Sequence, residues 1–264
     1  MSYPFLKGHG THNDFVVLPD HDGSVHGDLD AARVRALCDR RGGLGADGVL
    51  RVVREQDRWF MDYRNADGSI AEMCGNGIRV FALHLVQEGL ADAGEPFGVD
   101  TRDGVKTVTV DGDAHEGQVT VDMGVPTVLG ETEVSVGDHT WAATHVDVGN
   151  PHAVAFVDDL ADAGSLLEAP AYDAAVYPHG VNVEFVVRRG EGHVAMRVHE
   201  RGAGETQACG TGACAVALAS MAGSGPATYR VDQPGGTVTI TRDREGRVLM
   251  SGPAVIVARG TTDL

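Results

Sequence analysis

The chain is poor in lysine, aromatic residues and cysteine, and it has no long apolar run. Lys7 and Lys106 are its only lysines, and 21 Lys and Arg residues face 38 Asp and Glu, a formal net charge of −17. A nucleic acid or an anionic membrane needs a basic face on its partner, so neither is expected here. No stretch approaches the roughly 18 apolar residues of a membrane span, and residues 1–10 lack the apolar segment of a secretory signal.

Four cysteines in 264 residues are too few for a disulfide scaffold. They indicate reduced thiols and a cytoplasmic protein. No CxxC or HxxxH pair with ligand spacing accompanies the 12 histidines, so no metal site is expected. The 36 glycines, about twice the usual share of roughly 7%, indicate many tight turns or backbone that approaches a ligand closely.

Two segments, 75–87 and 212–221, have the composition of helices that are apolar nearly all round, which is typical of helices buried on every side. Each follows a Cys-Gly-X-Gly turn, at Cys74 and at Cys209. Asn65 precedes Cys74 by nine residues, and Glu200 precedes Cys209 by the same number. Farther upstream, Asn13 and Asn150 stand at nearly equal distances from the two cysteines. This spacing predicts an internal repeat.

The predicted fold class is therefore α+β, with two pseudo-symmetric halves. Each half is expected to be a strongly curved β-sheet or barrel wrapped around one central buried helix. We place the first half, which carries Cys74, at residues 1–113, and the second, which carries Cys209, at 114–251. A last strand at about 252–264 is expected to return to the first half.

A cysteine just before a helix has a clear chemical use. The unpaired N–H groups and the dipole of a helix N-terminus favour an anion, so they lower the pKa of a thiol and make it a usable base. The glycines let a carboxylate lie directly on the backbone amides. If the two halves face each other, one thiolate could remove a proton from a carbon while the opposite thiol returns one to the other face. Such an inversion needs no cofactor.

Together these blocks resemble the diaminopimelate epimerase family, a group of cofactor-independent, two-cysteine epimerases of lysine biosynthesis. The resemblance runs along almost the whole chain. It rests on the segments 13–15, 45–48, 64–69, 74–79, 149–152, 181–185, 200–202, 208–212, 234–236 and 252–254.

The resemblance implies interconversion of LL- and meso-2,6-diaminopimelate, with Cys74 and Cys209 as the acid and base. It implies that Asn13, Asn65, Asn150 and Asn182 hold the amino and carboxylate groups of the substrate. Glu200 would take an ammonium and Arg201 the distal carboxylate, for which its bidentate fork is suited. Main-chain amides at Gly75, Asn76, Gly210 and Thr211 would bind the reacting carboxylate, and His152, with Glu200, would tune the thiols.

Three positions depart from the family pattern. His12 stands where many members have a glycine, and Gly48 stands where some have a substrate-binding glutamine. Ala258 stands where some have a tyrosine at a dimer contact, so the homodimer that the resemblance implies lacks that support.

Three other functions are open from the residues alone. A proline racemase-like enzyme would share the fold and the two thiols, but it typically has histidine at the position of Asn76 and lacks the block at Glu200-Arg201. A non-catalytic amino-acid-binding protein on the same fold would need neither thiol. A thiol oxidoreductase would use Cys74 and Cys209 as a redox pair.

Overall fold

The computed structural model describes residues 2–112, 116–221, 225 and 227–264. Its contacts divide the chain into two compact units, Met1–Val121 with Gly252–Leu264, and Asp122–Ser251. The boundary expected at 113/114 lies outside the described residues. Across the described ranges, no helix is long and apolar enough to cross a membrane.

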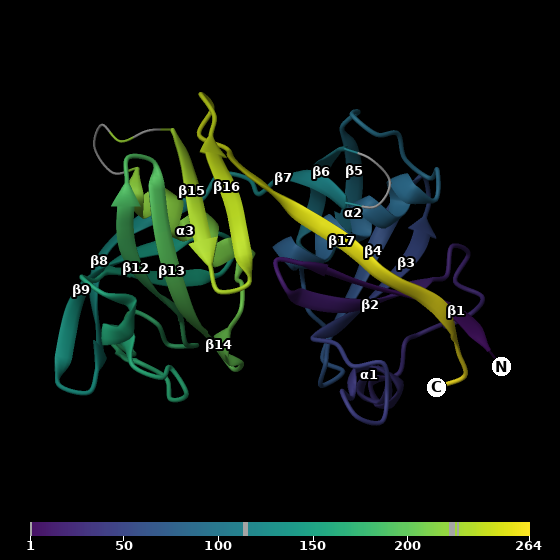
Figure 1. Cartoon of the computed structure of the whole chain (residues 1–264), viewed down its shortest axis with the longest axis horizontal. Helices are drawn as coiled ribbons and strands as arrows, with labels where there is room; N and C mark the ends of the chain where they lie inside the picture. The colour runs from purple at the N-terminus through teal and green to yellow at the C-terminus, as the bar shows by residue number, and fades with distance from the viewer. Residues whose placement is uncertain (1, 113–115, 222–224, 226) are drawn as a thin grey trace. The chain divides into compact units, whose positions relative to one another are not determined.

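In the first unit, each strand pairs with the next and the last returns to the first, so the sheet closes into a barrel (Figure 1). In the described residues its strands, in pairing order, are β1 (Tyr3–Gly10), β2 (Asn13–Pro19), β3 (Gly48–Glu55), β4 (Arg58–Asn65), β5 (Phe97–Thr101), β6 (Gly104–Asp111), β7 (Glu116–Asp122) and β17 (Val248–Thr262). β2 and β3 are parallel, as are β4 and β5. Closure leaves this sheet without a free edge.

Helix α2 (Gly75–Gln87) connects β4 to β5 and lies inside this barrel. Its residues from Gly75 through Leu85 are all buried, as the lack of a polar face predicts. Helix α1 (Ala31–Cys38) connects β2 to β3 outside the ring, capped by the side chain of Asp30, which accepts from the amide of Ala32. Its buried face packs with residues of β2 and β3.

The second unit repeats this connectivity. In the described residues its strands are β8 (Thr127–Val136), β9 (His139–Asp147), β10 (Pro151–Phe156), β11 (Ala171–Tyr172), β12 (Asn182–Gly190), β13 (His193–Glu200), β14 (Gly204–Thr206), β15 (Thr228–Gln233) and β16 (Gly236–Arg242), together with the first residues of β17. β10 and β12 are parallel, with the 3-10 helix η1 (Leu160–Ala163) between them in sequence. β13 and β15 are parallel, connected through α3 (Gly210–Ser220).

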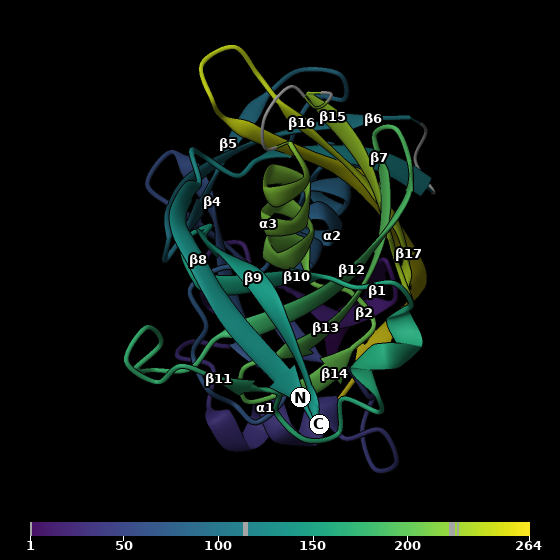
Figure 2. The same ribbon diagram turned by 90° about the vertical axis from the view of Figure 1, so that its left-hand side faces the viewer.

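Figure 2 shows α3 enclosed by the curved sheet of this second unit. Among the described residues, no strand pairing joins β8 to β17, so the ring has a seam there. Two backbone hydrogen bonds span it just before β8: Met123 N–H donates to Val248 O, and Val248 N–H donates to Gly124 O, both at 2.8 Å. The predicted fold, two similar halves each wrapped around a buried helix, is confirmed; α3 begins two residues earlier than expected.

The register of the parallel strand pairs shows which residue of the first unit corresponds to which residue of the second. In the first unit Phe15 lies opposite Gly48, and in the second His152 lies opposite Asn182. Counting along the strands, Phe15 therefore corresponds to His152, and Leu50 to Glu184. The cysteines, each at the N-cap of the central helix, correspond in the same way.

Candidate functional site

Cys74 caps α2, and its thiol lies beside two asparagines of the first unit. Its Sγ donates to Oδ1 of Asn13 at 3.6 Å, and Nδ2 of Asn76 donates to the same oxygen at 3.3 Å. Nδ2 of Asn13 donates to a carboxylate oxygen of Asp47 at 2.8 Å. Asp47 thus fixes the orientation of the Asn13 amide, so its oxygen faces Cys74.

A charged cluster surrounds this asparagine. Arg40 contacts Asp14 at 2.7 Å and Asp47 at 2.6 Å, and Lys7 contacts Asp14 at 2.5 Å. Burial raises the pKa of Asp14, but hydrogen bonds from Arg40 and Lys7 outweigh it and lower that pKa to about 2. The cluster therefore holds the Asp14 carboxylate ionised next to Asn13.

Arg79 is a fully buried cation on α2. Its guanidinium donates to Gly75 O, to Pro253 O and to the hydroxyl of Thr11, each at 3.2 Å. These bonds are needed because a buried charge without hydrogen bonds is strongly unfavourable. A Cβ at Gly10 would lie 2.9 Å from the backbone oxygen of Asn76 and 2.8 Å from Nη2 of Arg79, so glycine is required there. Sequence reasoning gave Arg79 no role beyond the motif.

The turn between β1 and β2 explains one departure from the family pattern. Thr11 and His12 both have positive φ, 50° and 62°, as a two-residue hairpin of type I′ demands. Glycine adopts this conformation without steric cost, whereas His12 is held in it by the two strands.

The close packing around Gly48 explains why this position differs from the family pattern. A Cβ there would lie 2.6 Å from Arg64 O and 2.7 Å from the ring of Tyr63, so no side chain fits without rearrangement. The hydroxyl of Tyr63 donates to Oδ1 of Asn65 at 2.8 Å, and Nδ2 of Asn65 donates to the hydroxyl of Ser69 at 3.0 Å. Tyr63 and Ser69 therefore orient Asn65.

Cys209 caps α3 and is buried, with 5% of its surface exposed. Its Sγ accepts from Gly212 N–H at 3.3 Å and lies 3.5 Å from the hydroxyl of Thr211. Its own N–H donates to Oε1 of Gln233 at 2.8 Å. Gln233, which sequence reasoning missed, thus anchors the cysteine backbone from β15.

The electrostatics at Cys209 differ from the expectation. Burial raises the pKa of its thiol well above the ordinary value, and the carboxylates of Glu200 and Glu184 raise it further. Hydrogen bonds from Thr211 and Gly212 act in the opposite direction but do not prevail. The N–H of Gly212 in the first turn of α3 thus lowers the pKa of the thiol, as predicted, but desolvation and the two carboxylates exceed this effect, and the net shift of Cys209 is upward.

A buried acid–imidazole pair lies in the same unit. His152 on β10 and Glu184 on β12 are both 0% exposed, and Nδ1 of His152 lies 2.6 Å from Oε1 of Glu184. The other ring nitrogen, Nε2, lies 2.9 Å from Oδ1 of Asn150. A Cβ at Gly212 would lie 2.8 Å from Oε1 of Glu184, which brings the pair against the first turn of α3.

The remaining expected residues of this unit lie at the ends of β12 and β13. Oδ1 of Asn182 accepts the backbone N–H of Arg201 at 2.9 Å, and its Nδ2 donates to Pro151 O at 3.3 Å. The guanidinium of Arg201, an exposed residue, donates to His179 O at 3.0 Å. Glu200 accepts a short hydrogen bond from the hydroxyl of Thr206.

The expected residues thus divide into two groups, one in each unit. The first holds Asn13, Asn65, Cys74, Gly75 and Asn76; the second holds Asn150, His152, Asn182, Glu200, Arg201, Cys209, Gly210 and Thr211. Sequence reasoning missed Asp47, Glu184 and Gln233. For Glu184 a signal was present, since a carboxylate interrupts the otherwise apolar core of β12.

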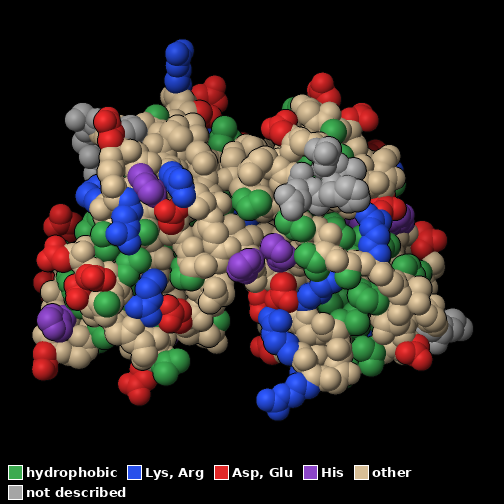
Figure 3. Space-filling model, viewed as in Figure 1, with side chains coloured by type: hydrophobic (Ala, Val, Ile, Leu, Met, Phe, Trp, Pro, Cys, Tyr) green, Lys and Arg blue, Asp and Glu red, His purple; other side chains and the backbone are tan. Residues whose placement is uncertain are grey.

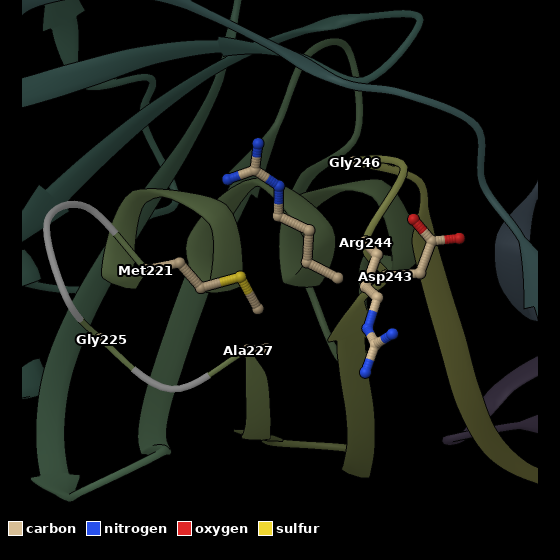
Figure 4. Close-up of a pocket in the computed structure, with 7 residues that line it drawn as sticks. Met221, Gly225, Ala227, Asp243, Arg244 and Gly246 are labelled. Carbon is tan, nitrogen blue, oxygen red and sulfur yellow. The ribbon is translucent and has the colours of Figure 1, made fainter.

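A pocket of about 290 Å³, outside both groups, lies between the end of α3 and the turn after β16 (Figure 4); it is lined by Met221, Gly225, Ala227, Arg242, Asp243, Arg244 and Gly246. On the face seen in Figure 3, acidic side chains are spread among basic ones rather than gathered in one patch.

Comparison with solved structures defines the fold class. A PhzF-family phenazine biosynthesis protein of Bacillus anthracis matches with a TM-score of 0.72 at 15% identity, covering 100% of both chains. A hydroxyproline epimerase of Agrobacterium vitis matches with a TM-score of 0.69 at 14% identity, covering 99% of this chain and 92% of that one. At such low identity the likeness concerns the fold alone, which is that shared by these epimerases and PhzF proteins.

Sequence comparison is more specific. The family model for diaminopimelate epimerase matches residues 5–129 and 144–257. The diaminopimelate epimerase of Streptomyces coelicolor is 55% identical, over 98% of this chain and 95% of that protein. The diaminopimelate epimerase of Rhodococcus jostii is 50% identical, over 98% of this chain and 96% of its own. The chain belongs to the diaminopimelate epimerase family, as its motifs predicted.

Proposed function

We propose that this chain is an isomerase that interconverts LL- and meso-2,6-diaminopimelate in lysine biosynthesis. Family membership over nearly the whole chain supports the substrate. The observation that carries the chemistry is that each unit places one cysteine at the N-cap of its central helix, beside an oriented polar group.

The proposed reaction uses one thiolate and one thiol. The thiolate takes the proton from the α-carbon, and the electron pair of the broken C–H bond moves into the carboxylate to give an enediolate-like species. The thiol then gives its proton to the opposite face of the carbon. The raised pKa of Cys209 suits it as the proton donor in the resting protein, which makes Cys74 the base. In the reverse direction the roles exchange.

The reacting carboxylate needs donors that stabilise its growing negative charge. We assign these to main-chain amides at the helix N-termini, at Gly75, Asn76, Gly210 and Thr211. The N-terminal position of these amides in buried helices supports the assignment, because they are aligned before the substrate arrives.

The other polar residues would hold the ends of the substrate. We assign Asn13, Asn65, Asn150 and Asn182 to its amino and carboxylate groups, Glu200 to an ammonium, and Arg201 to the distal carboxylate. His152, with Glu200, would tune the thiols. Hydrogen bonds within each unit already fix the amides of Asn13, Asn65 and Asn182, which lowers the entropy lost on binding.

Incubation of the wild-type protein with LL-diaminopimelate in D2O tests this function. We expect meso product carrying one deuterium at the inverted α-carbon, because the returned proton comes from a thiol that exchanges with solvent. Proline, which lacks the second amino-carboxylate end, should react very poorly. Comparable rates on proline would replace this proposal with the proline racemase-like alternative, and absence of deuterium in diaminopimelate would refute it.

We propose that the protein lies in the cytoplasm and that it forms a homodimer. The support for the homodimer is the family resemblance, together with an exposed apolar position on β17: Val257 is 55% exposed and stands next to the exposed Ala258. Sedimentation of the wild type and of Val257→Glu tests the dimer. A dimeric mass that the charge reduces to monomer is expected, and a monomeric wild type would contradict it.

A further inference from the structure

Glu184 stands out because it is a wholly buried carboxylate with very few partners. Its Oε1 meets His152, whereas Oε2 has no hydrogen-bond partner within the described residues. Burial raises the pKa of this carboxyl, and His152 opposes that effect. Such a group is costly to keep in a fold unless it serves a purpose.

The two hydrogen bonds of the His152 ring fix where its protons lie. Nε2 is 2.9 Å from Oδ1 of Asn150, and an amide oxygen can only accept a hydrogen bond, so Nε2 carries a proton and is the donor. On the other side of the ring, a hydrogen-bonding proton lies between Nδ1 and Oε1 of Glu184, which are 2.6 Å apart.

We infer that Glu184 is a positioning residue, which acts through His152 to fix the orientation of the Asn150 amide. With Oδ1 of Asn150 occupied by the ring N–H, the amide presents its NH2 group as the donor for a substrate carboxylate. The inference rests on the proposed function, in which Asn150 contacts the substrate.

The first unit shows that the fold does not need this pair. The corresponding positions hold Phe15 and Leu50. Their side chains would lie 3.4 and 3.2 Å from a Cβ at Gly77, in the first turn of α2, and Glu184 would contact a Cβ at Gly212 in the first turn of α3 in the same way. There the asparagine beside the cysteine is oriented by a surface carboxylate, Asp47, instead. Apolar side chains at these two positions are thus sufficient for packing. In the second unit the buried Glu184 contacts His152, which in turn contacts Asn150.

The first experiment compares side chains at position 184. Glu184→Leu matches the packing of the first unit but removes the acceptor, and we expect kcat/KM for diaminopimelate to fall by about 100-fold, the effect of a misplaced contact group. Glu184→Gln can still hydrogen-bond to Nδ1, so its loss should be about 10-fold or less. If packing were the only role, the leucine variant would be as active as wild type, and that result would overturn the inference.

A double-mutant cycle separates positioning from a general structural effect. Glu184 reaches Asn150 through His152, so whatever loss of kcat/KM Glu184→Gln causes in the wild type should be absent from an Asn150→Ala background. In a His152→Phe background the coupling should vanish. Additive effects would contradict the inference, even if each variant were impaired. The glutamine variant serves here because it keeps the fold intact if the leucine variant does not.

Proton NMR provides a readout that does not depend on activity. The short, buried Nδ1–Oε1 bond should give a low-field proton signal that exchanges slowly, and His152→Phe and Glu184→Leu should abolish it. Asp232→Asn is the matched control: it removes a similar contact, 2.7 Å from His193, at a partly exposed site, and should change neither the signal nor kcat/KM. Absence of the signal in wild type would overturn the inference, whereas its presence without epimerisation would count against the proposed function alone.

Discussion

The two units share one chain path but surround their cysteines differently. In the first, the position five residues into the helix after Cys74 holds the buried Arg79, and the strands behind it contribute Phe15 and Leu50. In the second, the matching helix position holds the buried Cys214, and the strands contribute His152 and Glu184. One unit thus buries a cation on its helix, the other an acid–imidazole pair. The same backbone path thus carries different buried side chains in the two units, and in the second unit one of them, Glu184, helps to raise the pKa of the Cys209 thiol.

The largest expected effect comes from removing either thiol. Because each acts on one face of the carbon, Cys74→Ala and Cys209→Ala should each lower epimerisation by about 10²- to 10⁴-fold. Cys38→Ala and Cys214→Ala are matched controls in the core of each unit and should affect stability at most. Near-wild-type epimerisation by either catalytic variant, measured as conversion of one stereoisomer into the other, would contradict the two-base mechanism.

Making the second unit resemble the first is expected to have the next largest effect. His152→Phe or Glu184→Leu alone breaks a buried pair and should lower the free energy of unfolding by about 3–5 kcal/mol. The double variant leaves neither member of the buried pair without its partner, so denaturant unfolding should find it closer to wild type than either single variant. It should still be a poor epimerase. A double variant whose loss equals the sum of the single losses would show that the two side chains are not a unit.

A smaller effect is expected from changing Arg201, which we assign to the distal carboxylate of the substrate. The first unit has no counterpart of this residue. Arg201→Lys keeps the charge but loses the bidentate fork, so kcat/KM for diaminopimelate should fall by the equivalent of about 1.5–3 kcal/mol. Steady-state kinetics on both stereoisomers measure this. An unchanged kcat/KM would mean that Arg201 does not bind the distal carboxylate.

The smallest expected effect is acid destabilisation, which should be similar in the two units. Burial opposes ionisation of Asp14 and Asp232, but hydrogen bonds from Arg40 and Lys7, and from Thr237, His193 and Arg230, lower each pKa from 3.8 to about 2. Since the folded pKa is the lower one, each carboxylate stabilises the fold above pH 3.8, by at most about 2 kcal/mol, and this is lost as the pH falls toward 2.

Melting curves of Asp14→Asn and Asp232→Asn between pH 7 and pH 2 measure this contribution. Each variant should differ from wild type at pH 7 and approach it at pH 2. A constant difference across the range would show that the lost stability does not come from ionisation.

The sequence predicted the repeat and the buried helices because these depend on local signals. The Cys-Gly-X-Gly turns mark where α2 and α3 begin, and the absence of a polar face on residues 75–87 indicates burial. The bonds of Glu184 could not be predicted, because they depend on the parallel register that places Val154 of β10 opposite it and His152 nearby. A shift of one residue would turn Glu184 to the other face of the sheet.

Arg79 is a second case of this kind. Its position on an apolar helix is visible in the sequence, but its partners are Thr11, sixty-eight residues earlier, and Pro253, 174 residues later. The seam between β8 and β17 likewise could not be predicted, because it depends on the relative placement of two strands that are far apart in the sequence.

Strand β17 has a consequence for how the protein is made. Its first residues pair with β16, and the rest run antiparallel to β1, with Thr262 opposite Tyr3. During synthesis the strands β1–β7 leave the ribosome before the second unit, yet their ring can close only when β17, which follows the second unit, has emerged. The first unit is therefore completed after the second has been translated, and until then β1 has an open edge, which β17 later covers.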